Sequence, residues 1–477
     1  MTVRTELAPA PAPAAERLPP ARTALLLSAI LLSAAGGTVS AVGLLNADKP
    51  LVVVPLALAV GAVAAALAVT RFAVFVMLMI ALRASVDVSK LTPSSQSATR
   101  AQELSSRVLT PSTLVVGLFI VAAALWLLAQ ARSGNLHRGL ALRRAWVLFA
   151  LTGFLSLLAS ADRTRTLVGA AQVLAIALMY VVLDELMTDV RTRNRLLTAV
   201  YASALGPLLY TIAGFALGNP AAQVKGDFLR LAGTFTQTND FGRYLMILIL
   251  FGVAVFRHVK RNWRPAFALM IGTCAVFMLL TYTLTAIFGT ALGLLVLGIW
   301  HSRRVLVGLV VAGLCAFVVA PQLVARVNSV GPTSASYNSP GYHSSSLLWR
   351  FSYWEQVLPL ANADPVTGIG LNMTATMTEQ NKQPHNDFLR AYVEEGVVGE
   401  LAFLAVLAAM VALGVRATRA SPRGSLDRGV GAGFLACAVA IVASSAADNV
   451  FTNVAVQWYL VAFAAAASSV VRRRRDQ

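Results

Sequence analysis

One histidine of the chain's five, His385, stands among polar and charged residues where a hydrophilic segment meets an apolar one. It belongs to the sequence Pro384-His385-Asn386-Asp387, and Glu394 follows on the apolar side. An imidazole accepts a proton from a hydroxyl near neutral pH, so His385 is a candidate general base. Asp387 is the alternative base. Asn386 and Glu394 are candidates for support, the first by orienting the imidazole and the second by holding the loop or a neighbouring cation.

Basic side chains accompany this histidine in two separate polar segments. They are Arg350 and Lys382 in the same segment, Lys225 and Arg230 in an earlier one, and Arg243 just after the earlier one. Arginine donates planar, bidentate, charge-assisted hydrogen bonds to phosphate and keeps its proton. Together these cations predict a site for a lipid diphosphate at the membrane surface. Arg230 and Arg243 each have a simpler interpretation, as residues near helix ends that extend toward the interface.

The composition is typical of a membrane protein. Of the 477 residues, 57% are hydrophobic and 13% are charged, whereas a soluble domain carries about 25% charged residues. The net charge of +18 would suit a nucleic-acid partner, but the basic residues lie in short loops between apolar runs. We therefore expect no nucleic acid among the partners. The three cysteines lie inside apolar runs and the polar segments lack metal-ligand spacing. We therefore expect no disulfide framework, no metal and no other cofactor.

Fourteen apolar runs are long enough to cross all or most of a hydrocarbon core as helices. In the pair 51–69 and 72–86 the second run is short and Arg71 is the only break, and a re-entrant hairpin there would leave twelve full spans. We expect an all-α polytopic integral membrane protein with about 12–14 transmembrane helices. The runs are 23–45, 51–69, 72–86, 113–130, 145–160, 166–183, 196–217, 241–256, 265–284, 286–300, 304–320, 398–415, 429–447 and 452–471.

Basic residues also orient these helices. Most of the 39 Lys and Arg residues fall in loops on the side of the N-terminus, and cytoplasmic loops carry such an excess. Both termini are then expected in the cytoplasm. The expected segments are a disordered cytoplasmic tail at 1–22, N-terminal transmembrane helices at 23–320 with an extracytoplasmic loop at 218–240, a large extracytoplasmic catalytic loop at 321–397, C-terminal transmembrane helices at 398–471 and a basic cytoplasmic tail at 472–477.

Four short motifs occur in order between roughly residues 190 and 415. They are Arg230-x-x-Gly233-Thr-Phe235-x-x-x-Asn239, Arg350-x-x-x-Trp354, Pro365-x-x-Gly368-x-Gly370, and His385-Asn386-x-x-Leu389-x-x-x-x-Glu394-x-Gly396-x-x-Gly399. This pattern resembles the O-antigen ligase and polymerase superfamily of bacterial membrane glycosyltransferases. Asp448-Asn449, between the last two apolar runs, follows the same layout.

The resemblance implies a glycosyltransferase of C-type architecture in the bacterial plasma (inner) membrane. Such enzymes take glycan from an undecaprenyl-diphosphate carrier on the outer face of the membrane, with inversion and without a required metal. The expected partners are that lipid-linked donor, a glycan or lipid-glycan acceptor, and membrane lipids.

For such a reaction, the chemistry of the candidate residues predicts their roles. We expect His385 to be the general base on an acceptor sugar hydroxyl, and Arg230 and Arg350 to stabilise the diphosphate leaving group. Additional donor-binding cations are Arg243, Lys225 and Lys382, and Asn239 is a supporting residue.

One stretch departs from the family pattern. Many relatives have an arginine in a Ser-Arg-Gly type motif, where residues 280–289 of this chain read Leu-Thr-Tyr-Thr-Leu-Thr-Ala-Ile-Phe-Gly. Either Arg243, Lys225 or Arg350 supplies that charge, or this chain handles the carrier differently.

Two further alternatives concern function. A ligase and a polymerase use the same donor and differ in the acceptor, and the sequence does not separate them. The rival class is a transporter or flippase for polysaccharide or lipid-linked glycan. Carriers of that kind need ionisable residues near the membrane midplane, and the interiors of these apolar runs are essentially uncharged.

Overall fold

The structure is a computed structural model that describes residues 28, 29, 31, 49–86, 111–137, 139–225, 228–306, 308 and 346–475. It divides the chain into two units, residues 1–76 and 77–477. The expected tail at 1–22, nearly all of the apolar runs 23–45 and 304–320, and the first part of the large polar loop lie outside the described residues.

The described part is almost entirely helical, with one small hairpin. The hairpin strands β1 and β2 are antiparallel, with Gln223 opposite Arg230. The elements are α2 (Lys49–Thr70), α3 (Phe72–Val86), α5 (Pro111–Arg132), α6 (Ala141–Leu155), α7 (Arg163–Leu186), α8 (Val190–Ala202), α9 (Leu205–Ala216), β1 (Ala222–Lys225), β2 (Phe228–Leu231), α10 (Thr238–Val255), α11 (Arg264–Leu280), α12 (Leu284–Trp300), α15 (Ser346–Val357), α16 (Thr374–Met377), α17 (Asp387–Arg419), α18 (Leu426–Ser445) and α19 (Val454–Arg475).

Nine helices of the described residues are long and apolar enough to cross a membrane, and three shorter apolar helices accompany them. The prediction of a polytopic all-α membrane protein is confirmed at this level. The predicted number of 12–14 spans stays a prediction, because two of the fourteen runs fall mostly outside the described residues.

The run predicted at 196–217 is two helices, α8 and α9, rather than one. Pro207 lies in the first turn of α9, and proline has no N–H to donate to the carbonyl four residues earlier. The α-helical ladder is therefore interrupted between Ala202 and Leu205. The same segment still counts as one candidate span, Val190–Ala216.

Helix α19 lies at the centre of the larger unit. Its apolar stretch is fully buried, whereas only 17% of the corresponding stretches of α5 and α11 is buried. The ring of Phe463 stacks on Phe251 of α10 with centroids 3.9 Å apart, and Trp458 meets Phe119 of α5 edge-on at 4.9 Å. Side chains that face lipid need no protein partner, so the burial pattern identifies α19 as core and α5 and α11 as peripheral helices.

Helix α17 is broken at Gly396, whose φ of +69° is a conformation that side chains disfavour. A Cβ on Gly396 would lie 2.2 Å from the carbonyl oxygen of Val366, and one on Gly368 would lie 2.3 Å from the carbonyl carbon of Glu394. The two glycines therefore allow the 365–370 segment to pack against the break. The helix begins at Asp387, well before the predicted boundary of the last helices at 398.

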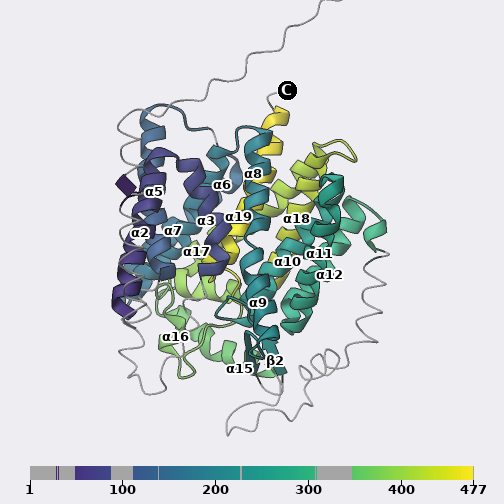
Figure 1. Cartoon of the computed structure of the whole chain (residues 1–477). Helices are drawn as coiled ribbons and strands as arrows, with labels where there is room; N and C mark the ends of the chain where they lie inside the picture. The colour runs from purple at the N-terminus through teal and green to yellow at the C-terminus, as the bar shows by residue number, and fades with distance from the viewer. Residues whose placement is uncertain are drawn as a thin grey trace, which may run out of the picture. The chain divides into compact units, whose positions relative to one another are not determined.

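The polar segment before α17 forms a small layer at one end of the larger unit. Figure 1 shows α15, α16 and β2 at this end, and the C-terminal end of α19 at the other. The layer has its own hydrophobic cluster, in which Tyr353 and Val357 of α15 pack with Ile369, Met373 and Val393. This cluster joins α15 to the first turns of α17, so the segment between them has a fixed support.

The opposite end of the unit is held by ion pairs between helices. Arg472 of α19 pairs with Asp184 of α7. Arg193 of α8, which is buried, lies 2.6 Å from Asp427 of α18. Buried charges are stable in a membrane protein when they are paired. The basic residues that the orientation argument assigned to the cytoplasm therefore include several that connect helices.

Candidate functional site

His385 lies directly before α17, with its backbone in the left-handed region at φ +52°. Its Nδ1 atom is 3.2 Å from Oδ1 of Asp448, and its side chain is 26% exposed. Asp448 lies in the short connection between α18 and α19 and is only 2% exposed. When Nδ1 carries the proton and donates it to this carboxylate, Nε2 keeps a lone pair. The pair is therefore arranged to present a base.

Asp448 is also the centre of a buried polar cluster. Asn239 donates from Nδ2 to Oδ2 of Asp448 at 3.0 Å, and Thr285 lies 3.4 Å from the same oxygen. The Nη1 atom of Arg243 is 3.7 Å from Oδ2. Burial alone would raise the pKa of Asp448, but the charge of Arg243, together with His385 and Arg350, holds that pKa well below its usual range. The carboxylate is therefore ionised beside His385.

Arg243 is buried in the first turns of α10, where a charge is costly unless it is paired. Its Nη2 atom donates to Oδ1 of Asp240 at 2.6 Å, and its Nε to the backbone oxygen of Asn239 at 3.2 Å. The simpler interpretation, in which Arg243 extends toward the interface, is therefore wrong. Arg243 instead supports Asp448 from inside the bundle.

Arg230 on β2 is 4% exposed and binds protein groups. Its Nε donates to the backbone oxygen of Thr281 at 2.8 Å, and Nη2 donates to Asn239 at 2.9 Å and to Thr283 at 3.1 Å. These bonds join the hairpin to the connection between α11 and α12. That connection belongs to the 280–289 stretch that lacks the family arginine, so Arg230 reaches the same place from another element. Its side chain is in a position to orient Asn239.

Arg350 on α15 differs from Arg230 and Arg243 in its bonding. Its guanidinium is partly buried and has no hydrogen-bond acceptor among the residues that the structure describes. Burial lowers the pKa of Arg350, and the charge of Asp448 opposes that shift. A cation held near His385 and Asp448 without a bonded acceptor is suited to bind an anionic group.

Trp349 of α15 lies beside the histidine. Its ring centroid is 5.9 Å from that of His385 in an edge-on arrangement, and the Nζ atom of Lys382 lies 4.9 Å from the Trp349 ring. Lys382 is thus held near the imidazole by a cation–π contact. Of the remaining predicted cation, Lys225, only the backbone is described, opposite Phe228 in the hairpin.

Three aromatic residues of α15 hold the segment that leads to His385. Trp354 donates from Nε1 to the backbone oxygen of Pro384 at 2.6 Å, and Trp349 donates from Nε1 to Gln380 at 2.8 Å. The hydroxyl of Tyr353 is 2.7 Å from that of Thr378. The spacing of Arg350-x-x-x-Trp354 therefore has a physical basis, since one helical turn separates the cation from an anchor of the histidine.

The two polar residues after the histidine have structural partners. Asn386 caps α17, because its Oδ1 accepts from the backbone N–H groups of Phe388 at 3.0 Å and Leu389 at 3.2 Å. We expected Asn386 to orient the imidazole, and the structure gives that position to Asp448. Asp387 is buried and accepts from the N–H of Val450 at 2.8 Å. Its carboxylate thus holds the α18–α19 connection, an arrangement that does not favour it as the alternative base.

Glu394 is fully buried under the 365–374 segment. Its carboxylate accepts from the N–H groups of Asn372 at 2.9 Å and Thr374 at 3.2 Å, and from Nε of Arg390 at 3.0 Å. It therefore contacts both the loop and a neighbouring cation, the two alternatives that the sequence left open.

Sequence reasoning did not assign a role to Asp448 or Trp349. Asp448 carried one usable signal, since it is an acidic residue in a short break between two apolar runs, on the side predicted for His385. Trp349 directly precedes Arg350 and carried no comparable signal. Its role follows from the orientation of α15 over the 378–385 segment.

Comparison with known proteins adds one finding. Residues 269–404 match the family model described as O-antigen ligase. The matched residues include Arg350 and His385 but exclude Arg230, Arg243 and Asp448. The match supports the resemblance drawn from the motifs. No curated protein sequence matches the chain.

Proposed function

We propose that this chain, a multi-helix membrane protein with an O-antigen ligase domain, transfers glycan from an undecaprenyl-diphosphate-linked donor onto an acceptor hydroxyl. The observation that carries this proposal is the His385–Asp448 pair, with Nδ1 and Oδ1 3.2 Å apart, at the end of the bundle where Arg350 and Lys382 also lie. A histidine oriented by a buried carboxylate is suited to general-base catalysis, and cations beside it are suited to a diphosphate leaving group.

In the proposed step, Nε2 of His385 takes the proton of the acceptor hydroxyl as its oxygen attacks the anomeric carbon of the donor sugar. A new carbon–oxygen bond forms on one face of the sugar while the bond to the diphosphate breaks on the other. The electron pair of the broken bond leaves with the diphosphate, so the anomeric configuration inverts. The imidazolium that forms is stabilised by the carboxylate of Asp448.

Arg350 and Lys382 are proposed to bind the diphosphate, where negative charge grows as the bond breaks. Arg350 is favoured because it is partly buried and has no acceptor of its own in the described part of the chain. Arg230 and Arg243 are proposed to act indirectly, since both are buried and bonded to protein groups. In this proposal Arg230 positions Asn239, and Arg243 keeps Asp448 ionised. No metal is required, because the leaving-group charge is met by cationic side chains.

The proposed site faces the extracytoplasmic side of a bacterial inner membrane, with both termini in the cytoplasm. This orientation is supported by the excess of basic residues in the loops at the other end of the chain's helices. If the lipid-linked donor and the acceptor react at that surface, the product is released on the extracytoplasmic side.

The proposal is tested by reconstituting the purified full chain with a synthetic polyprenyl-diphosphate-linked oligosaccharide and candidate acceptors. Glycan transfer that is lost in His385→Ala protein is the expected result. If no acceptor receives glycan and the protein instead moves the lipid-linked oligosaccharide across the membrane of proteoliposomes, the result would support a transporter. Analysis of carrier-linked glycans after gene deletion separates the two enzymes, since single repeat units accumulate without a polymerase and long chains accumulate without a ligase.

A further inference from the structure

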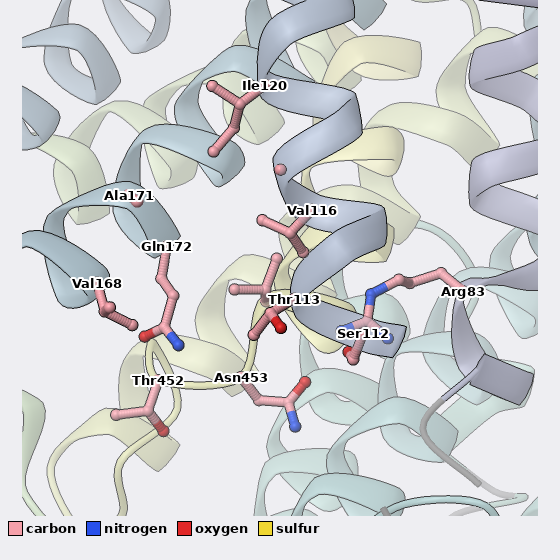
Figure 2. Close-up of a pocket in the computed structure, with 12 residues that line it drawn as sticks. Arg83, Ser112, Thr113, Val116, Ile120, Val168, Ala171, Gln172, Thr452 and Asn453 are labelled. Carbon is pink, nitrogen blue, oxygen red and sulfur yellow. The ribbon is translucent and has the colours of Figure 1, made fainter. Parts of the chain in front are cut away.

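A cavity of about 230 Å³ lies between α3, α5, α7 and the residues that precede α19. Figure 2 shows its lining as polar at one end and apolar at the other. The polar lining residues are Arg83, Ser112, Thr113, Gln172, Thr452 and Asn453, and the apolar ones include Val116, Ile120, Val168 and Ala171. None of these residues has a role in the proposed transfer step.

The polar end has the chemistry of an anion site. Arg83 is 3% exposed and lines the cavity, so its guanidinium is a buried cation beside an open volume. Ser112 and Thr113 line it from the first turn of α5, a helix of 22 residues. The N–H groups and dipole at such a helix start favour a bound anion. A monovalent or divalent phosphate group at this end would meet a buried arginine, a helix start and the amide of Asn453.

The apolar end points to a lipid rather than a soluble phosphate. Val116 and Ile120 of α5 face Val168 and Ala171 of α7 across the cavity. The remaining surface of α5 is largely open, with Leu114, Val121 and Leu125 exposed, as expected of a helix that faces acyl chains. A molecule with a phosphate head and a hydrocarbon tail therefore fits both ends of this cavity.

The cavity is also connected to the catalytic pair. Asn453 donates from Nδ2 to Oδ2 of Asp240 at 2.7 Å, and Oδ1 of Asp240 accepts from Nη2 of Arg243 at 2.6 Å. The Nη1 atom of Arg243 lies 3.7 Å from Asp448, which contacts His385. A continuous row of polar contacts thus runs from the cavity wall to the imidazole.

We propose that this cavity binds a bilayer phospholipid by its phosphate, and that the bound lipid fixes Asn453 and thereby strengthens the arrangement of Arg243 and Asp448. The binding site stands on the cavity alone, whereas the effect on the enzyme rests on the proposed function. The lipid is neither donor nor acceptor, because the cavity wall does not include His385 or Arg350.

Binding is tested with the purified full chain by native mass spectrometry, with three probes. Phosphatidylglycerol carries both the phosphate and the acyl chains, diacylglycerol with the same chains lacks the phosphate, and glycerol phosphate lacks the chains. We expect retention of phosphatidylglycerol alone. If diacylglycerol is retained equally, the phosphate is not recognised and the proposed phosphate site is wrong. If glycerol phosphate is retained equally, the acyl chains are not needed and the ligand is not a lipid.

Two variants locate the site. Arg83→Gln removes the charge and should weaken phosphatidylglycerol binding about tenfold or more, the scale of one charge-assisted contact. Ala171→Trp fills the apolar end and should have a similar effect without any change of charge. The matched controls are Arg132→Gln at the other end of α5 and Leu167→Trp on the exposed face of α7, which should bind as the wild type does. Unchanged binding in well-folded Ala171→Trp protein would place the lipid elsewhere.

The effect on catalysis is a separate measurement. Glycan transfer by the wild type should rise severalfold as phosphatidylglycerol is added to a neutral detergent, and transfer by Ala171→Trp protein should stay at the basal rate. If the protein binds phosphatidylglycerol but glycan transfer does not rise, the proposed effect of the lipid on catalysis is wrong and the binding site still stands. A chain that binds the lipid but transfers no glycan under any condition would contradict the proposed function instead.

Discussion

The Nδ1 atom of His385 and the Oδ1 atom of Asp448 lie 3.2 Å apart, although 63 residues and two membrane helices separate them in the chain. The histidine precedes α17 and the aspartate follows α18, and both helix ends meet at the same end of the bundle. The packing of α17 against α18 therefore sets the geometry of the pair. Gly414 makes part of this packing possible, since a Cβ there would lie 2.7 Å from the Cα of Leu435.

Replacing His385 separates catalysis from donor binding. His385→Ala should lower turnover by about 10²- to 10⁴-fold, the contribution of a general base. Affinity for the lipid-linked donor should stay near the wild-type value, because Arg350 and Lys382 carry it in the proposed mechanism. Equilibrium binding of a fluorescent donor and single-turnover rates measure the two quantities. Near-normal turnover in folded His385→Ala protein would remove the histidine from the mechanism.

Asp448→Asn tests whether the carboxylate acts through the histidine. An amide has no charge to stabilise an imidazolium, and its N–H can donate to Nδ1 and so leave the proton on Nε2. We expect a fall in kcat of about 10²-fold or more. The double variant with His385→Ala should be no slower than His385→Ala alone, because both changes remove one unit of catalysis. Additive losses would show that Asp448 acts independently of the imidazole.

The pH dependence of stability tests the charge state of Asp448. Burial raises the pKa of Asp448, but Arg243, His385 and Arg350 together hold that pKa well below its usual range. A carboxyl group with a lowered pKa stabilises the fold above its unfolded-state value of about 4, and this stabilisation is lost only as pH falls through the lower folded-state pKa. Between pH 7 and 5 Asp448 should therefore stay ionised.

Over this pH range the contribution of Asp448 to the stability of the fold should therefore not change. Thermal unfolding midpoints of the wild type and of Asp448→Asn protein, measured in the same buffers from pH 7 to pH 5, test this expectation. The difference between the two midpoints should stay constant across the range. A difference that shrinks toward pH 5 would mean that Asp448 gains a proton there.

Much of the architecture could be predicted because lipid imposes long apolar helices. The run predicted at 241–256, for example, is α10 at Thr238–Val255. The helical nature of α15 and of the first turns of α17 was missed, since both are polar segments that pack on their own small cluster. The residue types and the helix count also predicted that Arg230, Arg350 and His385 share one end of the bundle, and the structure brings them there around Asp448. The acceptor of each guanidinium could not be predicted, because it depends on tertiary contacts such as that of Arg230 with Thr281.

Arg230 and Arg350 are expected to respond differently to the same conservative change. Arg230→Lys leaves the backbone oxygen of Thr281 and the hydroxyl of Thr283 without their buried donor, at a cost of about 1–3 kcal/mol. The thermal midpoint should therefore fall, with donor affinity little changed in the protein that remains folded. If instead donor affinity falls and the midpoint does not, Arg230 binds the diphosphate directly, as the sequence analysis predicted.

Arg350→Lys should have the opposite effect. Lysine keeps the charge but cannot make the planar two-point contact with a phosphate group, so the donor KM should rise about tenfold while the midpoint stays near the wild-type value. Arg423→Lys, at an exposed position between α17 and α18, is the matched control and should change neither quantity. An unchanged KM in Arg350→Lys protein would leave Lys382 as the main donor-binding cation.

The side of the membrane on which the site lies decides whether the donor and acceptor can meet there. Ala363 is exposed in the layer formed by α15 and α16, and Ser133 is exposed at the end of α5. The native Cys274 and Cys437 are buried, and Cys315 is changed to Ser in the protein used for labelling. A single cysteine introduced at Ala363 or at Ser133 should then be the reactive thiol. An impermeant maleimide applied to intact cells should label Ala363→Cys, and should label Ser133→Cys only after permeabilisation, because the basic loops predict that Ser133 faces the cytoplasm. The reverse pattern would place His385 in the cytoplasm and remove the case for transfer at the outer surface.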